Sequence, residues 1–511
     1  MDRRDFLKSG IGTLSAAAML RGETADHRKH QLPKTDSHYR QVESYVENTP
    51  VPDYHWASPQ AYEAFRDMKV GIRVHWGIYS ANGQEHESWP YLGMSYAKKY
   101  RYDHLYKTWN PTGFDADHWA DLFSDAGGKM FVFTTKHHEG FCMFDTRTRV
   151  RSRANWAVPG GPTLESCDLA YSIMETPFRR DVVKEVCAAG RRRNLKVGLY
   201  FSHPDWYDAD FRPYCFHPVQ VPSAEKITGV PFAHNQRKGE ISITASDPTP
   251  AEVKRMIGRH RAQLSELLTN YGEIDMLSLD MWLGPAVWPE LRRTLLYLRK
   301  LQPNVMLRAR GIGNYGDYFT PESFVPGGKE DTGVPWMVIY PLADSFSYDP
   351  HAINYKGAGW IVHNVVDTVA KGGGLQIGVG PDVRGDFHPT AVRQLREGGR
   401  WLKLNAESIY PTRPRDGDLW HEGENIRYTR SKDGRFIYAF TLAWPGSELS
   451  LRTVRPKAHS SITMLGVSEP LKWTEDGSRG LVITMPAGFE DPAKRPCKFA
   501  WAFRIQGSDR L

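Results

Sequence analysis

Short runs of apolar residues alternate along this chain with longer stretches in which apolar residues recur every three or four positions. Alternation of strand-sized and helix-sized patterns is typical of successive βα units rather than of a sandwich of sheets. The apolar runs predict strands at residues 70–75, 130–135, 197–202, 274–280, 305–308, 337–340 and 375–379. Strands separated by helical sequence predict a parallel sheet covered by helices.

The helical period is clear in several of the intervening segments. Residues 251–270 place their apolar side chains on one stripe, and residues 115–126 do the same behind Asp115, whose carboxylate suits a helix N-cap. Further helices are predicted at residues 180–194 and 389–405. These helices have the length and the amphipathic character needed to cover a sheet.

The pattern changes near Tyr410. The segment Pro411-Thr412-Arg413-Pro414 is a proline-punctuated linker, and beyond it apolar and polar residues alternate, as in residues 436–440 and 499–505. Alternation with a period of two indicates strands that bury one face. The C-terminal part of the chain is therefore predicted to be an all-β domain of sandwich size.

Together these patterns predict an α/β protein. We expect a TIM-type (β/α)8-like barrel over residues 26–411, followed by a C-terminal β-sandwich over residues 412–511. In a barrel of this type, ligands bind at the face where the strands end.

The composition excludes several classes of protein. Apolar residues make up 40% and charged residues 24% of the 511 residues, which fits neither a disordered chain nor a polytopic membrane protein. The net charge of +7 is spread along the chain rather than gathered into a basic tail, so we expect no nucleic-acid partner and no membrane span. The five cysteines form no CxxC pair and predict no disulfide framework.

The first residues favour export. The paired arginines Arg3-Arg4 and the following Phe-Leu-Lys precede a mildly apolar run at residues 9–20. This arrangement resembles a twin-arginine signal, which directs folded proteins out of the bacterial cytoplasm. We therefore expect residues 1–25 to be a signal segment and the protein to be periplasmic or extracellular, with an ordinary amphipathic N-terminal helix as the alternative.

Polar and aromatic residues follow the predicted strands at corresponding positions. The first strand ends in His75-Trp76-Gly77, and the second leads into His137-His138-Glu139. The third leads from Tyr200 to Trp206, and the fourth ends in Ser278-Leu279-Asp280. Because the ends of parallel barrel strands meet at one face, these groups predict a pocket, and their rings and polar atoms suit a polyhydroxylated ring.

The same groups allow a second interpretation, a metal site. Three imidazoles and a carboxylate, from His75, His137, His138 and Asp280, are of the types that zinc sites use. The side chains of His137 and His138 would, however, diverge in an extended segment, and no HExxH or CxxC spacing is present. We therefore expect sugar ligands, with no metal and no other cofactor.

Several motifs resemble glycoside hydrolase family 29, the α-L-fucosidases. They are His75-Trp76-Gly77-Ile78-Tyr79-Ser80, the Thr-Thr-Lys-His-His-Glu-Gly-Phe-Cys block at 134–142, Gly198-Leu199-Tyr200-Phe201-Ser202, residues 316–322 and residues 379–382. The resemblance runs from about residue 60 to 415, and the family also carries a β-domain after this region. It implies retaining hydrolysis of α-L-fucosides at the barrel's C-terminal face, with a fucosylated glycan as the substrate.

Retention of configuration requires one carboxylate that attacks the anomeric carbon and a second carboxyl group that protonates the leaving oxygen. Asp280 closes an apolar strand and matches the family's nucleophile position. Glu322 matches an acid/base position of characterised relatives, with Glu87 as the rival because the family does not place this residue uniformly. The resemblance further implies fucose-binding roles for His75, Glu87, Trp89, His137, His138, Tyr200 and Arg310. Arg310 is expected near the nucleophile, where its charge would keep Asp280 ionised.

This chain departs from the family pattern at three places. Ser278 stands where the family usually has tryptophan, Glu87-Ser88-Trp89 replaces an adjacent Glu-Trp pair, and Ala309-Arg310 replaces an Asp/Asn-Arg pair. These changes alter the pocket without deleting the catalytic carboxylates, so they indicate a decorated substrate, such as a sulfated or O-methylated fucoside. A non-catalytic fucose-binding protein and a glycosidase for a galactoside-type sugar are the alternatives.

Overall fold

The structure is a computed structural model that describes residues 45–83, 86–159, 162–212, 217–219, 248–326 and 334–509. The predicted signal segment, residues 1–25, lies outside these residues, as does Cys215. Cys142, Cys167, Cys187 and Cys497 are free thiols. Within the described ranges, no helix combines the length and the apolar character that a membrane crossing requires.

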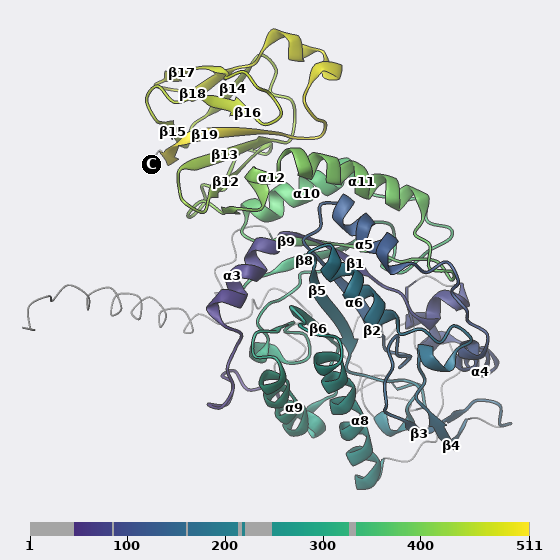
Figure 1. The fold of residues 1–511 in the computed structure, drawn as a ribbon. Coiled ribbons are helices and arrows are strands. Elements are labelled where there is room, and N and C mark those ends of the chain that lie inside the picture. Colours follow the sequence, from purple (N-terminus) through teal and green to yellow (C-terminus); the bar gives the residue numbers. More distant parts are fainter. Residues whose placement is uncertain are drawn as a thin grey trace, which may run out of the picture.

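A parallel sheet forms the centre of the molecule, and its strands coincide with the predicted apolar runs (Figure 1). In chain order they are β1 (Val70–Val74), β2 (Met130–Lys136), β5 (Lys196–Ser202), β6 (Met276–Asp280), β7 (Met306–Leu307), β8 (Met337–Pro341) and β9 (Gly374–Val379). They are hydrogen-bonded in the order β7-β6-β5-β2-β1-β9-β8. Every residue of β1, β2 and β9 is buried, as expected for strands that are covered on both faces.

An irregular segment, residues 318–323, joins the two edge strands of this sheet. Isolated parallel bridges pair Tyr318 with Arg308 on the β7 side and Glu322 with Ile339 of β8. The segment thus occupies the position of an eighth strand and gives the sheet its (β/α)8-like character. Glu322 lies on this strand-like segment, which the apolar pattern did not predict because Pro321 cannot donate to a ladder.

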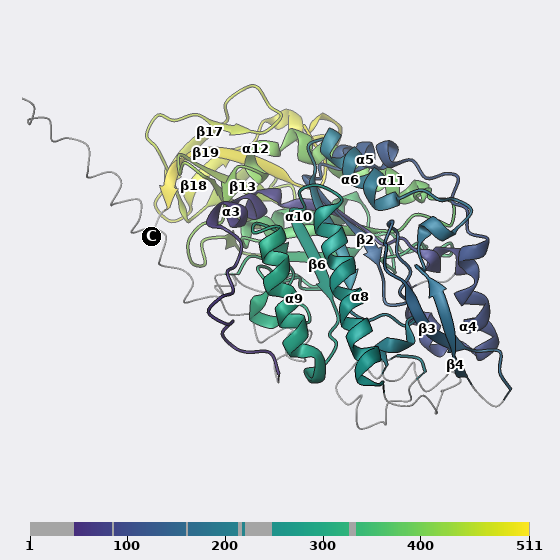
Figure 2. The same cartoon turned by 60° about the horizontal axis from the view of Figure 1, so that its bottom comes forward.

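Helices cover the outer face of the sheet. They are α5 (Ala116–Asp125), α6 (Val182–Arg192), α8 (Pro250–Thr269), α9 (Trp288–Leu301), α10 (Ala358–Ala370) and α11 (Pro389–Leu404). Of the other helices, α3 (Pro59–Met68) precedes β1, α4 (Tyr96–Asp103) lies between β1 and β2 in the chain, and α12 (Ala406–Ile409) follows α11 and contacts the C-terminal part. The predicted cap Asp115 accepts hydrogen bonds at the start of α5, and Thr249 with Glu252 forms a capping box on α8. Helices α8 and α9 lie side by side (Figure 2).

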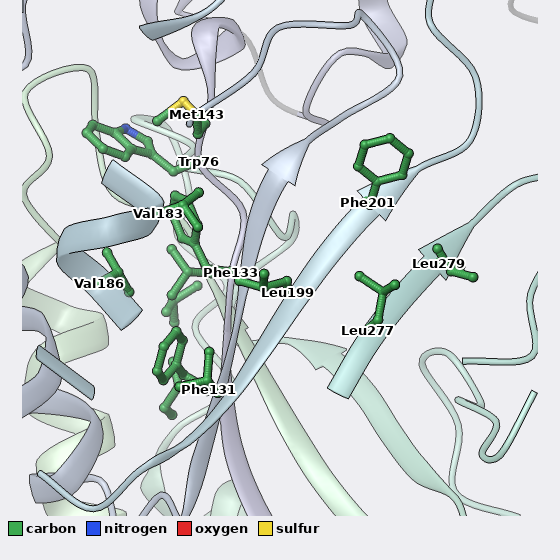
Figure 3. Close-up of a cluster of buried hydrophobic side chains, with 14 of the residues drawn as sticks. Trp76, Phe131, Phe133, Met143, Val183, Val186, Leu199, Phe201, Leu277 and Leu279 are labelled. Carbon is green, nitrogen blue, oxygen red and sulfur yellow. The ribbon is translucent and has the colours of Figure 1, made fainter. Parts of the chain in front are cut away.

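The core between sheet and helices is built from large apolar side chains. Phe131 and Phe133 of β2 lie next to Val183 and Val186 of α6, and all four are buried (Figure 3). This contact fixes α6 against the centre of the sheet. The same contact also fixes where the neighbouring strands end along the barrel axis.

A hairpin of β3 (Val150–Asn155) and β4 (Thr163–Leu169) stands apart from the main sheet. The apolar pattern does not predict it, because the apolar residues of its strands, among them the buried Val150 and Ala154, are separated by exposed or half-buried polar residues and form no continuous run. Arg153 of β3 donates a hydrogen bond of 2.6 Å to the hydroxyl of Tyr207, which follows β5. The hairpin therefore packs beside the face where the barrel strands end.

The C-terminal part forms antiparallel sheets, as predicted. Its strands are β10 (Thr412–Arg413), β11 (His421–Glu422), β12 (Ile426–Ser431), β13 (Phe436–Thr441), β14 (Glu448–Leu451), β15 (Val454–Pro456), β16 (Ile462–Met464), β17 (Lys472–Asp476), β18 (Gly480–Thr484) and β19 (Trp501–Asp509). This domain packs on the side of the barrel formed by α10, α11 and α12 (Figure 1). Trp401 of α11 donates a 2.8 Å hydrogen bond to the carbonyl of Ala500. The exact domain limits, 26–411 and 412–511, stay a prediction.

Candidate active site

The carboxyl ends of four neighbouring strands carry the residues that the sequence singled out. Asp280 is the last residue of β6, and Tyr200 lies near the end of the adjacent β5. His75 directly follows β1, and its backbone N–H binds the carbonyl of Val379 at 3.2 Å. The parallel register therefore brings these side chains to one face of the sheet.

Three donors hold the carboxylate of Asp280. The hydroxyl of Tyr200 donates to Oδ2 at 2.7 Å, and Arg308 donates a short hydrogen bond to Oδ1. Arg310 Nη1 approaches the same Oδ1 at 3.3 Å. Burial alone would raise the pKa of Asp280, but the charges of Arg308 and Arg310 outweigh burial and hold its pKa well below the ordinary value.

Arg310 joins the two candidate catalytic carboxylates. While Nη1 faces Asp280, Nη2 forms a hydrogen bond and ion pair with Glu322 Oε2. One planar guanidinium thus contacts both acids, which places their carboxyl groups on the same side of the site. The side chain of Glu322 is 28% exposed, against 14% for Asp280, so Glu322 is the more accessible of the two to solvent.

The backbone is strained beside each candidate carboxylate. Met281, which follows Asp280, has φ 62°, and Ser323, which follows Glu322, has φ 60°. Glu87 itself has φ 51°. Non-glycine residues rarely adopt these left-handed conformations, and such strain concentrates at functional sites where the surrounding packing enforces it.

The histidines form a compact aromatic cluster. The ring centroids of His137 and His138 lie 4.1 Å apart, and His75 lies 5.9 Å from His137 and 5.3 Å from Tyr200. The prediction that His137 and His138 diverge is therefore wrong: β2 ends at Lys136, and the chain turns, with the N–H of Gly140 bound to the carbonyl of His137. Nδ1 of His75 and Nδ1 of His138 are buried and have no hydrogen-bond partner among the residues that the structure describes.

Glu87, Ser88 and Trp89 reach the same cluster from the loop after β1. Ser88 Oγ is hydrogen-bonded to His137 Nδ1, and the ring of Trp89 lies 4.6 Å from that of His138. Glu87 is buried and accepts a 2.8 Å hydrogen bond from the backbone N–H of Ser347. Burial raises the pKa of Glu87, against the lowering effect of His137 and of the Ser347 N–H.

Two arginines in this region were missed by the sequence analysis. Arg73 lies within β1 and Arg308 directly follows β7, and both side chains are buried. Arg73 donates to His75 Nε2 at 2.9 Å, and both arginines donate to Ser278 Oγ. The sequence did contain a signal for them, namely a charged residue inside a predicted apolar strand. A charged side chain is rarely buried in such a place unless it is paired or hydrogen-bonded.

The metal interpretation finds no support in this geometry. Across the part of the chain that the structure describes, no group of three or more His, Cys, Asp or Glu side chains is arranged to hold a metal ion. Asp280 is instead satisfied by arginine and tyrosine donors. These contacts are those of an ionised organic acid rather than of a metal ligand.

The family model for alpha-L-fucosidase matches residues 41–407, and the model for the alpha-L-fucosidase C-terminal domain matches residues 421–506. The chain therefore belongs to the alpha-L-fucosidase family, glycoside hydrolase family 29, and is a glycoside hydrolase. The family resemblance, the fold class and the enzyme class that the sequence predicts are confirmed.

Individual relatives are distant but similar over most of their length. Tissue alpha-L-fucosidase of Homo sapiens is 27% identical over 474 residues, which cover 87% of this chain and 88% of the relative. Alpha-L-fucosidase isoenzyme 1 of Paenibacillus thiaminolyticus has a similar fold, with a TM-score of 0.69, 24% identity and coverage of 88% of this chain and 99% of that one. A GH29 alpha-L-fucosidase of Bacteroides thetaiotaomicron, solved as a trapped covalent intermediate, has a TM-score of 0.69 at 21% identity and covers 90% of this chain and 100% of that one.

Proposed function

We propose that this chain is an exo-acting, retaining α-L-fucosidase in which Asp280 is the nucleophile and Glu322 the general acid/base. The observation that carries the proposal is the contact of one guanidinium, that of Arg310, with both carboxylates. A retaining glycosidase needs its two carboxyl groups about 5 to 5.5 Å apart. Two acids that share a single guanidinium are consistent with that separation.

The first step uses the ionised form of Asp280. One carboxylate oxygen forms a bond to the anomeric carbon as the glycosidic C–O bond breaks, and Glu322 transfers its proton to the leaving oxygen. Arg308, Arg310 and Tyr200 keep the nucleophile charged and oriented before the attack. The covalent intermediate trapped in the Bacteroides thetaiotaomicron relative supports the same course of reaction here.

In the second step Glu322 changes from a general acid to a general base. Glu322 accepts a proton from water, the water oxygen bonds to the anomeric carbon, and the bond to Asp280 breaks. The product keeps the anomeric configuration of the substrate because the carbon is inverted twice. The partial exposure of Glu322 suits a group that must exchange a proton with water in each cycle.

Glu87 is the rival for the acid/base role. Its raised pKa is the property that a general acid needs, and the charge of Glu322 contributes to raising it, so the two groups are electrostatically coupled. We favour Glu322 because it shares Arg310 with the nucleophile, whereas Glu87 Oε1 is bound by the backbone N–H of Ser347. In this proposal Glu87 binds the substrate.

The remaining ring of residues binds the fucosyl unit. The buried, unpartnered Nδ1 atoms of His75 and His138 are suited to hydrogen bonds with hydroxyl groups. His137, Tyr200 and Arg310 complete the polar side, and Trp89, whose ring centroid lies 5.5 Å from that of Trp206, forms a stacking wall.

The natural substrate is proposed to be a decorated fucoside, either sulfated or O-methylated. The support is the change of the pocket wall at Ser278 and the altered Glu87-Ser88-Trp89 loop. Equal kcat/KM values for plain nitrophenyl fucoside and for every decorated fucoside would contradict this part of the proposal. The retaining mechanism does not depend on a preference for decorated substrates, so that result would leave the proposed mechanism unaffected.

The experiment for the main proposal is turnover of a fucoside panel with the product anomer followed by NMR. We expect α-L-fucose as the first product, and we expect D280N to lose at least about 10³-fold in kcat while it still binds fucose. Release of the β-anomer would contradict retention. Binding without turnover by the wild-type chain would indicate a fucose-binding protein, and faster turnover of galactosides would indicate the galactoside-type enzyme.

We also propose export by the twin-arginine route, supported by Arg3-Arg4 and the apolar run that follows. A fusion of residues 1–25 to a reporter that folds in the cytoplasm should be exported from a bacterial cell. Changing both arginines to lysine should retain the reporter in the cytoplasm. Export that is independent of the arginine pair would contradict the proposal.

A further inference from the structure

Arg73 projects into the interior of the barrel, where a charge is costly to bury. Its side chain is 1% exposed, and its hydrogen bonds reach three strands: His75 after β1, Ser278 of β6 and Gln376 of β9. The distances are 2.9 Å from Nε to His75 Nε2, and 3.3 Å from Nη1 to each of Ser278 Oγ and Gln376 Oε1. A buried guanidinium with such directed contacts constrains its acceptors.

The contact with His75 determines where that ring carries its proton. A guanidinium has donors only, so His75 Nε2 must be the unprotonated acceptor and the proton of the neutral ring lies on Nδ1. Burial and the charge of Arg73 hold the pKa of His75 well below its ordinary value, so the ring is neutral. Its Nδ1–H is buried and has no hydrogen-bond partner within the described part of the chain.

We propose that Arg73 is a positioning residue that holds His75 in the Nδ1–H form, so that His75 donates a hydrogen bond to an oxygen of the bound sugar. A buried N–H group without a hydrogen-bond partner is energetically unfavourable until a ligand or a water molecule accepts a hydrogen bond from it. The identity of the sugar as fucose rests on the proposed function. The assignment of the tautomer does not rest on the proposed function, because it follows from contacts within the protein in the absence of a sugar.

Ser278 extends this arrangement to the nucleophile. Its Oγ accepts from Arg73 Nη1 at 3.3 Å and from Arg308 Nη1 at 3.0 Å, which uses both lone pairs of the hydroxyl. Arg308 in turn donates to Asp280 through Nη2. One chain of hydrogen bonds therefore runs from His75 through Arg73, Ser278 and Arg308 to Asp280.

The size of residue 278 fits this role. The guanidinium carbons of Arg73 and Arg308 lie 5.0 Å and 5.8 Å from the centroid of the Tyr200 ring, whose hydroxyl binds Asp280. A serine leaves space for both arginines beside this ring, whereas a tryptophan at 278 would occupy it. The departure from the family's usual tryptophan is thus matched by two buried guanidinium groups.

The tautomer is measured directly by NMR of the full-length wild-type chain labelled with ¹⁵N-histidine, with His75 assigned by comparison with H75Q. We expect a protonated Nδ1 and an unprotonated Nε2, unchanged at neutral and mildly acidic pH. A proton on Nε2 would overturn the proposal. This measurement needs no variant of Arg73, so it decides the question even if such a variant fails to fold.

The variant R73M tests whether Arg73 causes the tautomer. The charged or titratable groups around His75 are Arg73, Arg308, His137, Tyr200 and Asp280. Without Arg73 we expect a proton on Nε2 in part of the molecules and protonation of the ring at higher pH than in the wild type. R415M, which removes a buried guanidinium of the C-terminal domain, is the matched control and should leave the His75 signals unchanged. An R73M spectrum identical to the wild type would overturn the causal role.

L-fucose added to the labelled wild-type chain should shift the His75 Nδ1 resonance, and R73M should raise KM for a fucoside about tenfold with a smaller change in kcat. S278A should keep the His75 tautomer and instead lower kcat, because it loosens Arg308 at the nucleophile. An Nδ1 resonance that fucose leaves unmoved would overturn the proposed hydrogen bond. If the wild-type chain does not turn over fucosides but His75 carries its proton on Nδ1, the proposed function is refuted. The tautomer assignment then remains valid.

Discussion

At the scale of single residues, the site is defined by which donors surround each acid. Asp280, Tyr200 and Arg310 could be identified from the sequence, because Tyr200 lies in a motif that resembles the family and Asp280 and Arg310 match positions that the resemblance implies. The role of Arg308 could not, since the sequence around a residue that follows a two-residue strand does not say which side chain it contacts on the neighbouring strand. That contact depends on the pairing and register of β6 and β7.

Removal of the Arg310 charge should change the pH dependence of the enzyme. R310M loses one of the two positive charges that lower the pKa of Asp280, so that pKa rises. The nucleophile must be ionised, and the acidic limb of the kcat/KM profile should therefore move to higher pH by about one unit. R384M, at an exposed arginine, is the control. An acidic limb at the same pH in R310M and the wild type would contradict the prediction.

The two candidate acids can be separated by chemical rescue. If Glu322 supplies the proton, E322Q should lose about 10²- to 10⁴-fold in kcat/KM with a poor leaving group, and much less with an activated aryl fucoside. Azide should then accelerate turnover of the activated substrate, because it attacks the intermediate without a general base. E87Q should raise KM without azide rescue. Rescue of E87Q alone would assign the role to Glu87.

At the scale of elements, the seven regular strands were predicted because each is a continuous apolar run that is buried on both faces. The segment at residues 318–323 was missed because its pairing consists of isolated bridges around Pro321. The β3–β4 hairpin was missed because its few apolar residues are separated by polar residues and form no apolar run. The apolar pattern reveals strands that are buried. It does not reveal a strand that is held mainly by isolated bridges or by polar contacts.

Asp317 anchors the irregular segment and offers a test of its importance. This buried carboxylate accepts from the N–H groups of Ala57 and Leu307 at 2.9 Å and 2.7 Å, and it pairs with Arg299. D317A should lower the free energy of unfolding by about 3–5 kcal/mol, because Arg299 is left buried and unpaired. Urea unfolding measures this value.

D416A, at a largely exposed aspartate, is the control for D317A and should change the free energy of unfolding by about 0.5 kcal/mol or less. The kcat of folded D317A should also fall, since the segment carries Glu322. A stability loss for D317A no larger than that for D416A would show that the segment does not depend on this anchor.

At the scale of the whole molecule, the apolar core of the barrel continues into the β-domain, which also has a separate apolar core of its own. Tyr438, Phe440 and Ala502 of the β-domain belong to the same buried cluster as the residues of the barrel. Trp401 lies at this junction, buried, with its ring 6.5 Å from that of Phe440. The two domains are therefore expected to unfold together.

W401A tests this coupling. Loss of the indole leaves a cavity at the junction and removes the hydrogen bond to Ala500, so the free energy of unfolding should fall by about 3–5 kcal/mol. Calorimetry should show one transition for the wild type and an earlier or divided one for W401A. Two separate transitions in the wild type, with only one of them shifted in W401A, would contradict a common core.

The irregular segment between β7 and β8 has an evolutionary consequence. Asp280 lies at the end of a regular strand that is paired along its whole length with β5, whereas Glu322 lies where the barrel wall is held by isolated bridges. Glu87 reaches the neighbourhood of Glu322 from a different loop. Under the proposed roles, the proton donor can therefore be exchanged between two loops in evolution while the nucleophile stays on its strand.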